Sequence, residues 1–329
     1  MPLADSLQRR WYENRSPPWW TVPVSLLYGA IVRARRALHR RGWMRGDRLP
    51  LPVIVVGNLT MGGAGKTPLV IALIEALRER GFKPSVVSRG YGGSARALRL
   101  LDAQPDPNEV GDEPALIRIR TGAPVAVGSD RPAAARLLLG QDIDVILADD
   151  GLQHYALARD VEICVIDGAR RFGNGRLLPA GPLREPMQRL REVDFNVCNG
   201  GTPASNEIPM RLAMDDARNL LDPSRRRVLP RFAGQCVHAI AGIGNPDRFF
   251  DALRVLGIDP IAHPFADHRH FVPGDLDFGD GLPVLMTEKD AVKCRAFAKD
   301  NWWSVPVTAQ LPRAFLDELA DRLAPLAKH

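Results

Sequence analysis

Residues 53–67 read VIVVGNLTMGGAGKT, and this stretch determines the expected fold. An apolar, β-branched run, Val53–Val56, enters a glycine-rich loop that ends in Lys66-Thr67, and a helical pattern follows. Three glycines allow the backbone N–H groups of such a loop to close around phosphate oxygens, and the start of the next helix adds its positive end. The stretch therefore predicts a Walker A phosphate-binding loop between a strand and a helix.

The loop also predicts which residues hold a nucleotide. Lys66 is expected to reach the β- and γ-phosphates, and Thr67 is expected to hold Mg²⁺. The first glycine of the usual G-x-x-x-x-G-K-T pattern is replaced by Thr60, so the loop matches a compact G-G-x-G-K-T form. A glycine-rich turn without a ligand is the alternative, and a Lys-Thr pair that opens a helix argues against it. The expected nucleotide contacts are Thr60, Gly62, Gly63, Ala64, Gly65, Lys66 and Thr67.

Strand and helix patterns alternate after Pro50, which predicts a parallel α/β sheet with helices on both faces. The predicted strands are Pro52–Val56, Ser85–Ser88, Pro124–Val127, Val145–Ala148 and Val161–Ile166, and the predicted helices are Thr67–Arg80, Glu113–Arg120 and Arg131–Leu139. The alternation thins over 168–228 and restarts at Cys236–Ala241. We therefore expect an N-terminal segment (1–48), a P-loop domain (49–228) and a smaller C-terminal α/β unit (229–329).

A pair of acidic residues, Asp149-Asp150, follows the apolar run Val145–Ala148. Carboxylates at the carboxyl end of a parallel strand lie at the sheet edge where α/β proteins bind ligands. We expect this pair to organise Mg²⁺ as a Walker B motif, and His154 is close enough in sequence to share the site. A simple helix cap is the alternative.

Two further acidic positions are candidates for a general base. Asp112 lies in Gly111-Asp112-Glu113-Pro114 at the start of a predicted helix, and the pattern by itself favours a plain N-cap. Residues 267–271, DHRHF, offer an aspartate with His268 and His270. Phosphoryl transfer to a hydroxyl needs a carboxylate or histidine within reach of the acceptor. Spacing alone does not bring Asp112 and His268 together.

The positive charge of the chain is concentrated at its N-terminus. The net charge is +6, yet residues 1–48 hold ten Arg, no Lys and three acidic residues, so they carry +7 and the remaining 281 residues carry −1. Because the rest of the chain is nearly neutral, we expect no nucleic-acid partner. The same segment holds four of the six Trp, at positions 11, 19, 20 and 43.

An uncharged run, Trp19–Val32, falls within this segment. Its fourteen residues are fewer than the roughly 20 that span a bilayer, and no signal-peptide pattern is present. On a helix, Arg33, Arg36 and Arg40 would lie opposite an apolar face of Leu27, Ile31, Ala34 and Leu38. With flanking Trp, this pattern is typical of a helix in a membrane interface. A helix packed on the domain, with Arg outward, is the alternative.

Seven motifs occur in an order that resembles the tetraacyldisaccharide 4′-kinase family of the lipid A pathway. They are VGNLTMGGAGKTP (56–68), SRGYGG (88–93), GDEP (111–114), ADDGLQH (148–154), GPLREP (181–186), AGIGNPDRFF (241–250) and DHRHF (267–271). The resemblance implies ATP- and Mg²⁺-dependent phosphorylation of the 4′-hydroxyl of a tetraacylated glucosamine disaccharide 1-phosphate. It also implies a peripheral, monotopic enzyme on the anionic lipid surface at the cytoplasmic face of the inner membrane, without an obligate protein partner.

Carried onto this chain, the resemblance assigns roles to the candidate residues. Asp112 becomes the expected base, assisted by His268, with His270 as the alternative. Asp150 joins them as a catalytic residue, and the expected metal ligands are Thr67, Asp149 and Asp150. The motifs place five further residues along the active-site cleft: Tyr91, Glu113, His154, Arg184 and Glu185.

Two other classes of P-loop protein are alternatives to this kinase interpretation. Membrane-associated regulatory ATPases of the partitioning type carry a signature Lys before the G-G-x-G-K-T run, where this chain has Met61. A GTPase of metal delivery would need an N-K-x-D motif. The nearest stretch, Thr287-Glu288-Lys289-Asp290, breaks that pattern and is interpreted as a helix cap.

Overall fold

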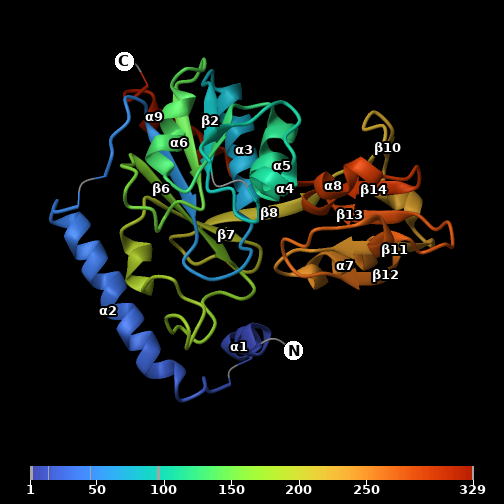
Figure 1. The fold of residues 1–329 in the computed structure, drawn as a ribbon, viewed down its shortest axis with the longest axis horizontal. Coiled ribbons are helices and arrows are strands. Elements are labelled where there is room, and N and C mark those ends of the chain that lie inside the picture. Colours follow the sequence, from blue (N-terminus) through green and yellow to red (C-terminus); the bar gives the residue numbers. More distant parts are fainter. Residues whose placement is uncertain (1–2, 14, 45, 95–96, 328–329) are drawn as a thin grey trace.

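The computed structural model describes residues 3–13, 15–44, 46–94 and 97–327 (Figure 1). Its α-helices are α1 (Leu3–Tyr12), α2 (Thr21–Arg40), α3 (Lys66–Glu79), α4 (Pro107–Val110), α5 (Asp112–Thr121), α6 (Arg131–Leu138), α7 (Pro246–Val255), α8 (Glu288–Cys294) and α9 (Arg313–Leu323). Its strands are β1 (Val53–Gly57), β2 (Pro84–Ser88), β3 (Arg99–Leu100), β4 (Val125–Val127), β5 (Val145–Asp149), β6 (Val161–Asp167), β7 (Phe195–Asn199), β8 (Ile208–Met214), β9 (Ala217–Asn219), β10 (Arg226–Arg227), β11 (Cys236–Ala241), β12 (Asp259–Pro264), β13 (Val284–Thr287), β14 (Trp302–Val305) and β15 (Val307–Gln310).

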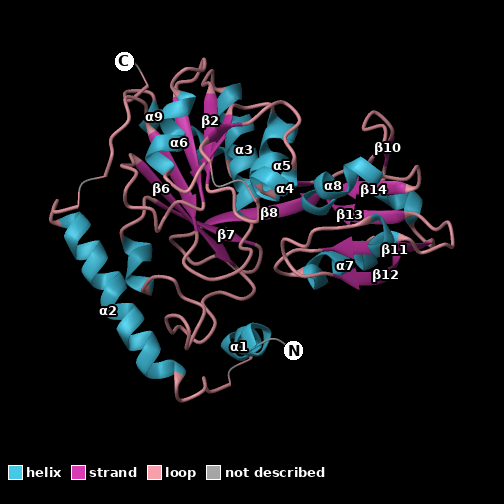
Figure 2. Ribbon diagram, in the orientation of Figure 1, coloured by secondary structure: helices cyan, strands magenta, loops and turns pink. Residues whose placement is uncertain are grey.

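The larger sheet contains β1, and its described strands run in the order β15-β8-β7-β6-β1-β5-β2-β4-β3. Figure 2 shows it beside the smaller sheet, with β6 and β7 in the larger sheet and β11 to β14 in the smaller one. Its central pairs are parallel, whereas β3 and β15 pair antiparallel at the two edges. The α/β class and the parallel P-loop sheet predicted from the sequence are therefore confirmed. Because β1 lies directly beside β5, the glycine-rich loop and Asp149-Asp150 leave the sheet at the same edge.

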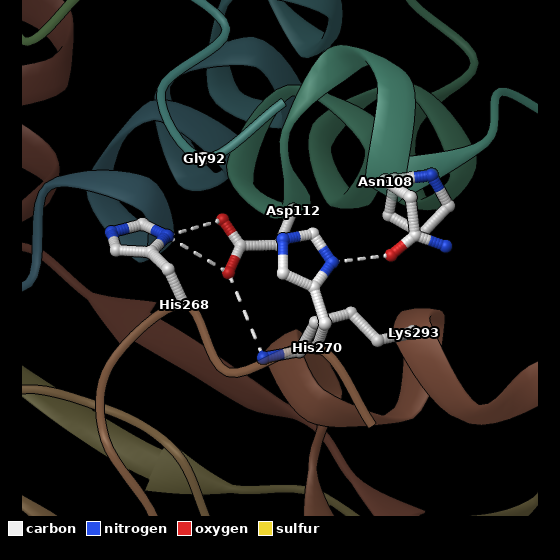
Figure 3. A pocket seen from close by; sticks show the side chains of 7 residues that line it. Gly92, Asn108, Asp112, His268, His270 and Lys293 are labelled. Atoms are coloured by element: carbon white, nitrogen blue, oxygen red, sulfur yellow. Dashed lines mark hydrogen bonds and ion pairs between the residues drawn. The ribbon is translucent and has the colours of Figure 1, made fainter. Parts of the chain in front are cut away.

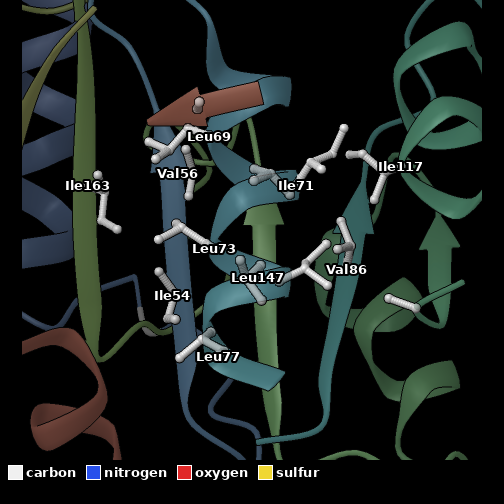
Figure 4. Close-up of a cluster of buried hydrophobic side chains, with 14 of the residues drawn as sticks. Ile54, Val56, Leu69, Ile71, Leu73, Leu77, Val86, Ile117, Leu147 and Ile163 are labelled. Atoms are coloured by element: carbon white, nitrogen blue, oxygen red, sulfur yellow. The ribbon is translucent and has the colours of Figure 1, made fainter. Parts of the chain in front are cut away.

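Helices cover both faces of this sheet. On one face α3 packs Leu69, Leu73 and Leu77, one helical turn apart, against Ile54 and Val56 of β1 (Figure 4). On the other face α6 contacts β2 and β4, and its Ala134 and Leu138 share a buried cluster with Val87 and Ala126 of those strands. Each fully buried leucine of this kind stabilises the fold by about 1.5–3 kcal/mol. The core thus fixes the start of α3, where the phosphate-binding loop ends.

The smaller sheet has the described strand order β10-β9-β14-β13-β11-β12. The chain passes from one sheet to the other after Met214 and returns after Val305, so β9 and β10 join the smaller sheet while β15 and α9 belong to the larger unit. The strands therefore do not divide at residue 228, the boundary expected from the sequence. Long-range pairing of short strands decides this membership, and local pattern does not reveal it.

Helix α2 lies against the larger unit along one side (Figure 1), through a face of small residues. Thr21, Ser25 and Gly29 are buried, and the Ser25 hydroxyl donates to the Leu177 carbonyl oxygen at 2.8 Å. Arg36, expected on the outward face, instead bonds Glu192. The apolar face points into solvent, with Leu27 64% and Ile31 58% exposed. The helix therefore packs on the domain, as the alternative held, but through small residues, so that its apolar face stays free to contact a membrane.

Across the described part of the chain, no helix is both long enough and apolar enough to pass through a bilayer.

Candidate active site

The conformation of the glycine-rich loop between β1 and α3 is fixed by two glycines with positive φ and by hydrogen bonds from two asparagines. Gly62 and Gly65 have φ values of 96° and 95°, a region that disfavours side chains. Asn58 Nδ2 donates to the Thr60 carbonyl oxygen at 2.8 Å, and Asn199 Nδ2 donates to the Ala64 carbonyl oxygen at 2.9 Å. Because these two carbonyl oxygens are hydrogen-bonded to asparagine side chains, the backbone N–H groups of the loop can bind an anion.

Lys66 opens α3 and turns its ammonium group toward the end of β5. Its Nζ atom donates to Asn58 Oδ1 at 3.1 Å and lies 3.5 Å from Asp150 Oδ1. Arg184 Nη1 donates to both oxygens of Asp150 at 3.1 Å. Although burial opposes it, Lys66 and Arg184 lower the pKa of Asp150 to about 2, so this carboxylate is ionised at neutral pH. Thr67 follows on the first turn of α3.

Asp149 has a different environment from its neighbour. Its side chain is 1% exposed, and neither carboxylate oxygen has a hydrogen-bond partner among the described residues. The Arg131 guanidinium fixes the strand end by donating to the Asp149 carbonyl oxygen at 2.8 Å. Burial, reinforced by the charge of Glu113, raises the pKa of Asp149 to about 7. An unpartnered buried carboxylate beside a phosphate-binding loop fits a Mg²⁺ ligand.

Asp112 and His268, 156 positions apart, meet in a narrow pocket between α5 and the loop that follows β12 (Figure 3). Asp112 opens α5 and is 3% exposed, and its two carboxylate oxygens lie 3.0 and 3.1 Å from His268 Nδ1. His270 turns away, with its Nδ1 atom 2.7 Å from Asn108 Oδ1. The structure therefore brings His268, and not His270, against Asp112.

The charges around this pair favour its ionised form. Burial alone would raise the pKa of Asp112, but the hydrogen bond with His268 and the charges of Lys289 and Lys293 lower it. Burial would likewise lower the pKa of His268, and the bond with Asp112 raises it. Asp112 is thus a carboxylate at neutral pH, next to a partner that can share a proton.

The C-terminal unit contacts the phosphate-binding loop at Gly244. A Cβ atom at Gly244 would lie 2.9 Å from the backbone nitrogen of Gly63 and 3.7 Å from Asp267 Oδ2, so only glycine allows this approach. Arg170 spans the same contact by donating to the Gly63 carbonyl oxygen at 2.6 Å and the Gly244 carbonyl oxygen at 3.5 Å. The loop that carries His268 is therefore fixed beside the phosphate-binding loop.

Comparison with known proteins identifies this arrangement. Residues 18–324 match the family model described as tetraacyldisaccharide-1-P 4′-kinase. The chain belongs to the tetraacyldisaccharide 4′-kinase family. Curated tetraacyldisaccharide 4′-kinases from Xanthomonas euvesicatoria pv. vesicatoria (strain 85-10) and Stenotrophomonas maltophilia (strain R551-3) are 52% and 51% identical to it, over 96% and 95% of this chain and 95% of each relative.

A solved structure gives the same result for the fold. The crystal structure of LpxK from Aquifex aeolicus in complex with ATP is similar to this kinase with a TM-score of 0.76 and 27% sequence identity. The match covers 93% of this chain and 98% of the LpxK chain. The family, the P-loop kinase fold and the kinase class expected from the motifs are therefore confirmed, and the regulatory ATPase and the GTPase are not supported.

The residues expected along the cleft of this kinase occupy distinct positions. Tyr91 is exposed and its ring meets His268 edge-on, with centroids 4.9 Å apart. Burial and nearby arginines lower the pKa of His154 to about 4, so its imidazole is neutral. Glu185 is 2% exposed, in a buried network with Tyr155 and Arg189. Their roles in the cleft stay predictions.

Sequence reasoning missed several residues that shape this site. Asn58 follows β1 directly, but nothing in its type or spacing signals a bond to Lys66. Asn199 ends β7, a strand for which no prediction was made. Lys289 lies within T-E-K-D, where Thr287 does cap α8 by accepting from the Asp290 backbone N–H. The expected helix cap was correct, but interpreting the stretch as a cap gave no reason to expect Lys289 in the site.

The environment of Asp149 predicts an unusual effect on stability. Because the folded chain binds the Asp149 proton more tightly than the unfolded chain does, this group lowers the free energy of unfolding as pH rises from about 4 to about 7. In metal-free protein at pH 8, Asp149→Asn should therefore raise the Tm by about 2 °C or more, and the difference should shrink at pH 5. Thermal unfolding of wild type, Asp149→Asn and the exposed control Asp142→Asn measures it. A lower Tm for Asp149→Asn at pH 8 would contradict the assignment.

Proposed function

We propose that this kinase transfers the γ-phosphoryl group of ATP to the 4′-hydroxyl of a tetraacylated glucosamine disaccharide 1-phosphate. The observation that carries the proposal is the Asp112–His268 pair beside the phosphate-binding loop, in a chain of this family. The pair supplies the base that transfer to an alcohol requires.

The position of each residue suggests its role in the transfer reaction. Lys66 and the N–H groups of the loop neutralise the phosphate oxygens. Asp112 accepts the proton of the attacking hydroxyl as the new P–O bond forms and the bond to the leaving ADP breaks. His268 keeps Asp112 oriented and shares the proton. Arg184 holds Asp150 in place at the phosphate side of the site.

Mg²⁺ is the expected cofactor, and the residues present fit it. Asp149, Asp150 and Thr67 would hold the ion. The Asp149 carboxylate is buried with no hydrogen-bond partner among the described residues, and the other two oxygen donors lie at the same sheet edge. The ion supplies charge neutralisation on the nucleotide phosphates when it is bound.

The amphipathic acceptor explains why a P-loop kinase carries α2. The exposed Leu27 and Ile31, with Trp19 at the start of the helix, form an apolar surface that suits the acyl region of a membrane. Exposed Arg33 and Arg40 favour anionic headgroups, at about 1 kcal/mol for each basic side chain near the surface. We place the enzyme peripherally on the cytoplasmic face of the inner membrane, where its lipid substrate is found.

Charge placed on the apolar surface of α2 should release the protein from membranes. Each of the two side chains contributes about 1.5–3 kcal/mol if it is buried in lipid, so Leu27→Glu/Ile31→Glu should weaken vesicle binding by more than about tenfold. Co-sedimentation with phosphatidylglycerol-containing vesicles measures this binding. Val255→Glu, at an 86% exposed position on α7, is the control and should bind as wild type does. Equal sedimentation of all three proteins would rule out membrane contact through α2.

A transfer assay tests the proposed function itself. Purified protein with γ-labelled ATP, Mg²⁺ and the tetraacyl disaccharide 1-phosphate should move the label into the lipid fraction. The lipid should be required for ATP consumption at the full rate. Label released only as inorganic phosphate, with or without the lipid, would instead indicate the regulatory ATPase.

A further inference from the structure

Lys289, on the first turn of α8, sits among three carboxylates. Its Nζ atom lies 3.0 Å from Asp267 Oδ1, 3.1 Å from Glu113 Oε1 and 3.8 Å from Asp112 Oδ2. Its side chain is 15% exposed. Burial opposes its charge, but the three carboxylates raise the pKa of Lys289 above its usual value. A permanently charged ammonium group is therefore fixed between the expected base and its acidic neighbours.

A second ion pair also joins α8 to α5. At the other end of α5, Arg120 binds Glu288 of α8, and it also donates to the Thr308 hydroxyl at 3.0 Å. Lys289 is therefore one of several charged residues that join the two helices. A lysine with only an attachment role would not need to face both Asp112 and Glu113 at the start of α5.

The neighbouring lysine on α8 does not replace Lys289. Lys293 Nζ also lies 3.8 Å from Asp112 Oδ2, and its closer carboxylate, at 2.9 Å, is Asp290 Oδ1. Of the two lysines, it is Lys289 that pairs with Glu113 and Asp267. Asp290 in turn accepts from the Gly242 backbone N–H at 2.8 Å. Lys293 and Asp290 thus support the loop at Gly242, and Lys289 is left to balance the acids around Asp112.

We infer that Lys289 is a positioning residue of the transfer reaction, which holds Asp112 ionised and separates it from Glu113 and Asp267. The inference rests on the proposed kinase function, and it means that the catalytic base is complete only when the C-terminal unit is docked on the P-loop domain. The charged groups that face Asp112 are His268, Lys289, Lys293, Glu113 and Asp267. Without Lys289, the three carboxylates of Asp112, Glu113 and Asp267 face only His268 and Lys293, and Lys293 also pairs with Asp290.

Lys289→Met should therefore act on catalysis and not on ATP binding. We expect kcat to fall by about 10²-fold, the KM for ATP to stay within about twofold, and the acidic limb of the kcat–pH profile to move up by about 1 unit. Lys289→Arg should return the limb to its wild-type position. Lys299→Met, which removes an exposed lysine paired with Asp277, is the matched control.

The outcomes separate this inference from the proposed function. If the wild-type protein shows no transfer activity, the proposed kinase function is rejected. The electrostatic effect of Lys289 on the site is then still tested by titrating His268 by NMR. Because Lys289 lowers the pKa of His268, Lys289→Met should raise it further. An unchanged His268 titration, or an active Lys289→Met with wild-type kcat and pH profile, would overturn the inference. If Lys289→Met does not fold, Lys289→Gln takes its place, because it also removes the charge: the same loss of kcat is expected, and a wild-type kcat with a wild-type pH profile would overturn the inference.

Discussion

Replacing Asp112 by asparagine is expected to lower kcat by about 10²–10⁴-fold, the usual contribution of a general base. Affinity for ATP should stay within a factor of about two, because the side-chain partners of Asp112 are His268 and two lysines of α8 and none of them belongs to the phosphate-binding loop. Asparagine keeps the size of the side chain and can still accept a hydrogen bond from His268. Steady-state rates and calorimetric titration with ATP measure the two quantities.

A nearby acid provides the matched control for Asp112. Asp106 caps α4 by accepting from the Asn108 backbone N–H at 2.9 Å and does not contact His268. Asp106→Asn should retain kcat within about twofold. Wild-type kcat in Asp112→Asn would show that Asp112 is only the N-terminal residue of α5 and not the base.

Replacing Lys66 by methionine is the second change with a large expected effect. The ammonium group is the cation that α3 directs at the phosphate side of the site, and its loss should lower kcat by about 10²–10³-fold and weaken ATP binding. The fold should survive, because Arg184 still pairs with Asp150 when Lys66 is gone. Turnover, ATP titration and thermal unfolding of the same protein measure these effects.

The control for Lys66 is Lys83→Met, which removes a surface lysine paired with Asp142. It should leave turnover and ATP binding unchanged. A Lys66→Met protein that binds ATP and turns over as wild type does would mean that the glycine-rich loop does not hold the phosphates.

Local pattern was enough to predict the centre of the fold. The strand β1 and the helix α3 lie within a residue of their expected positions, since an apolar run, a glycine loop and a helical repeat are each encoded within a few residues. The edge strands β8 and β15 had no such signal. They pair antiparallel across almost a hundred residues of sequence, and their alignment depends on the chain returning from the smaller sheet.

The candidate site shows the same limit. Asp149 and Asp150 could be placed from their strand. The Asp112–His268 contact joins the start of α5 to a loop of the C-terminal unit, which no spacing relates, and only the family resemblance suggested it. The role of Lys289 could not be predicted from local sequence either, because its three carboxylate partners lie on α5 and on the loop before His268.

Helix α2 illustrates a third case. Its periodicity gave the correct apolar face, but not the side of the helix that packs on the protein. The structure buries the face of Thr21, Ser25 and Gly29, because small residues allow close approach to the segment at Leu177. Hydrophobicity alone would have turned Leu27 and Ile31 inward.

The position of the transferred phosphate is the most direct test of the proposed reaction. After incubation of the wild-type protein with Mg-ATP and the tetraacyl disaccharide 1-phosphate, the lipid product should be examined by mass spectrometry and by phosphorus–proton NMR correlation. The proposed function predicts one added phosphate, as a monoester on the 4′-oxygen, with ADP formed in equal amount. Consumption of ATP with no phosphate on the lipid, or with the phosphate on another oxygen, would contradict it.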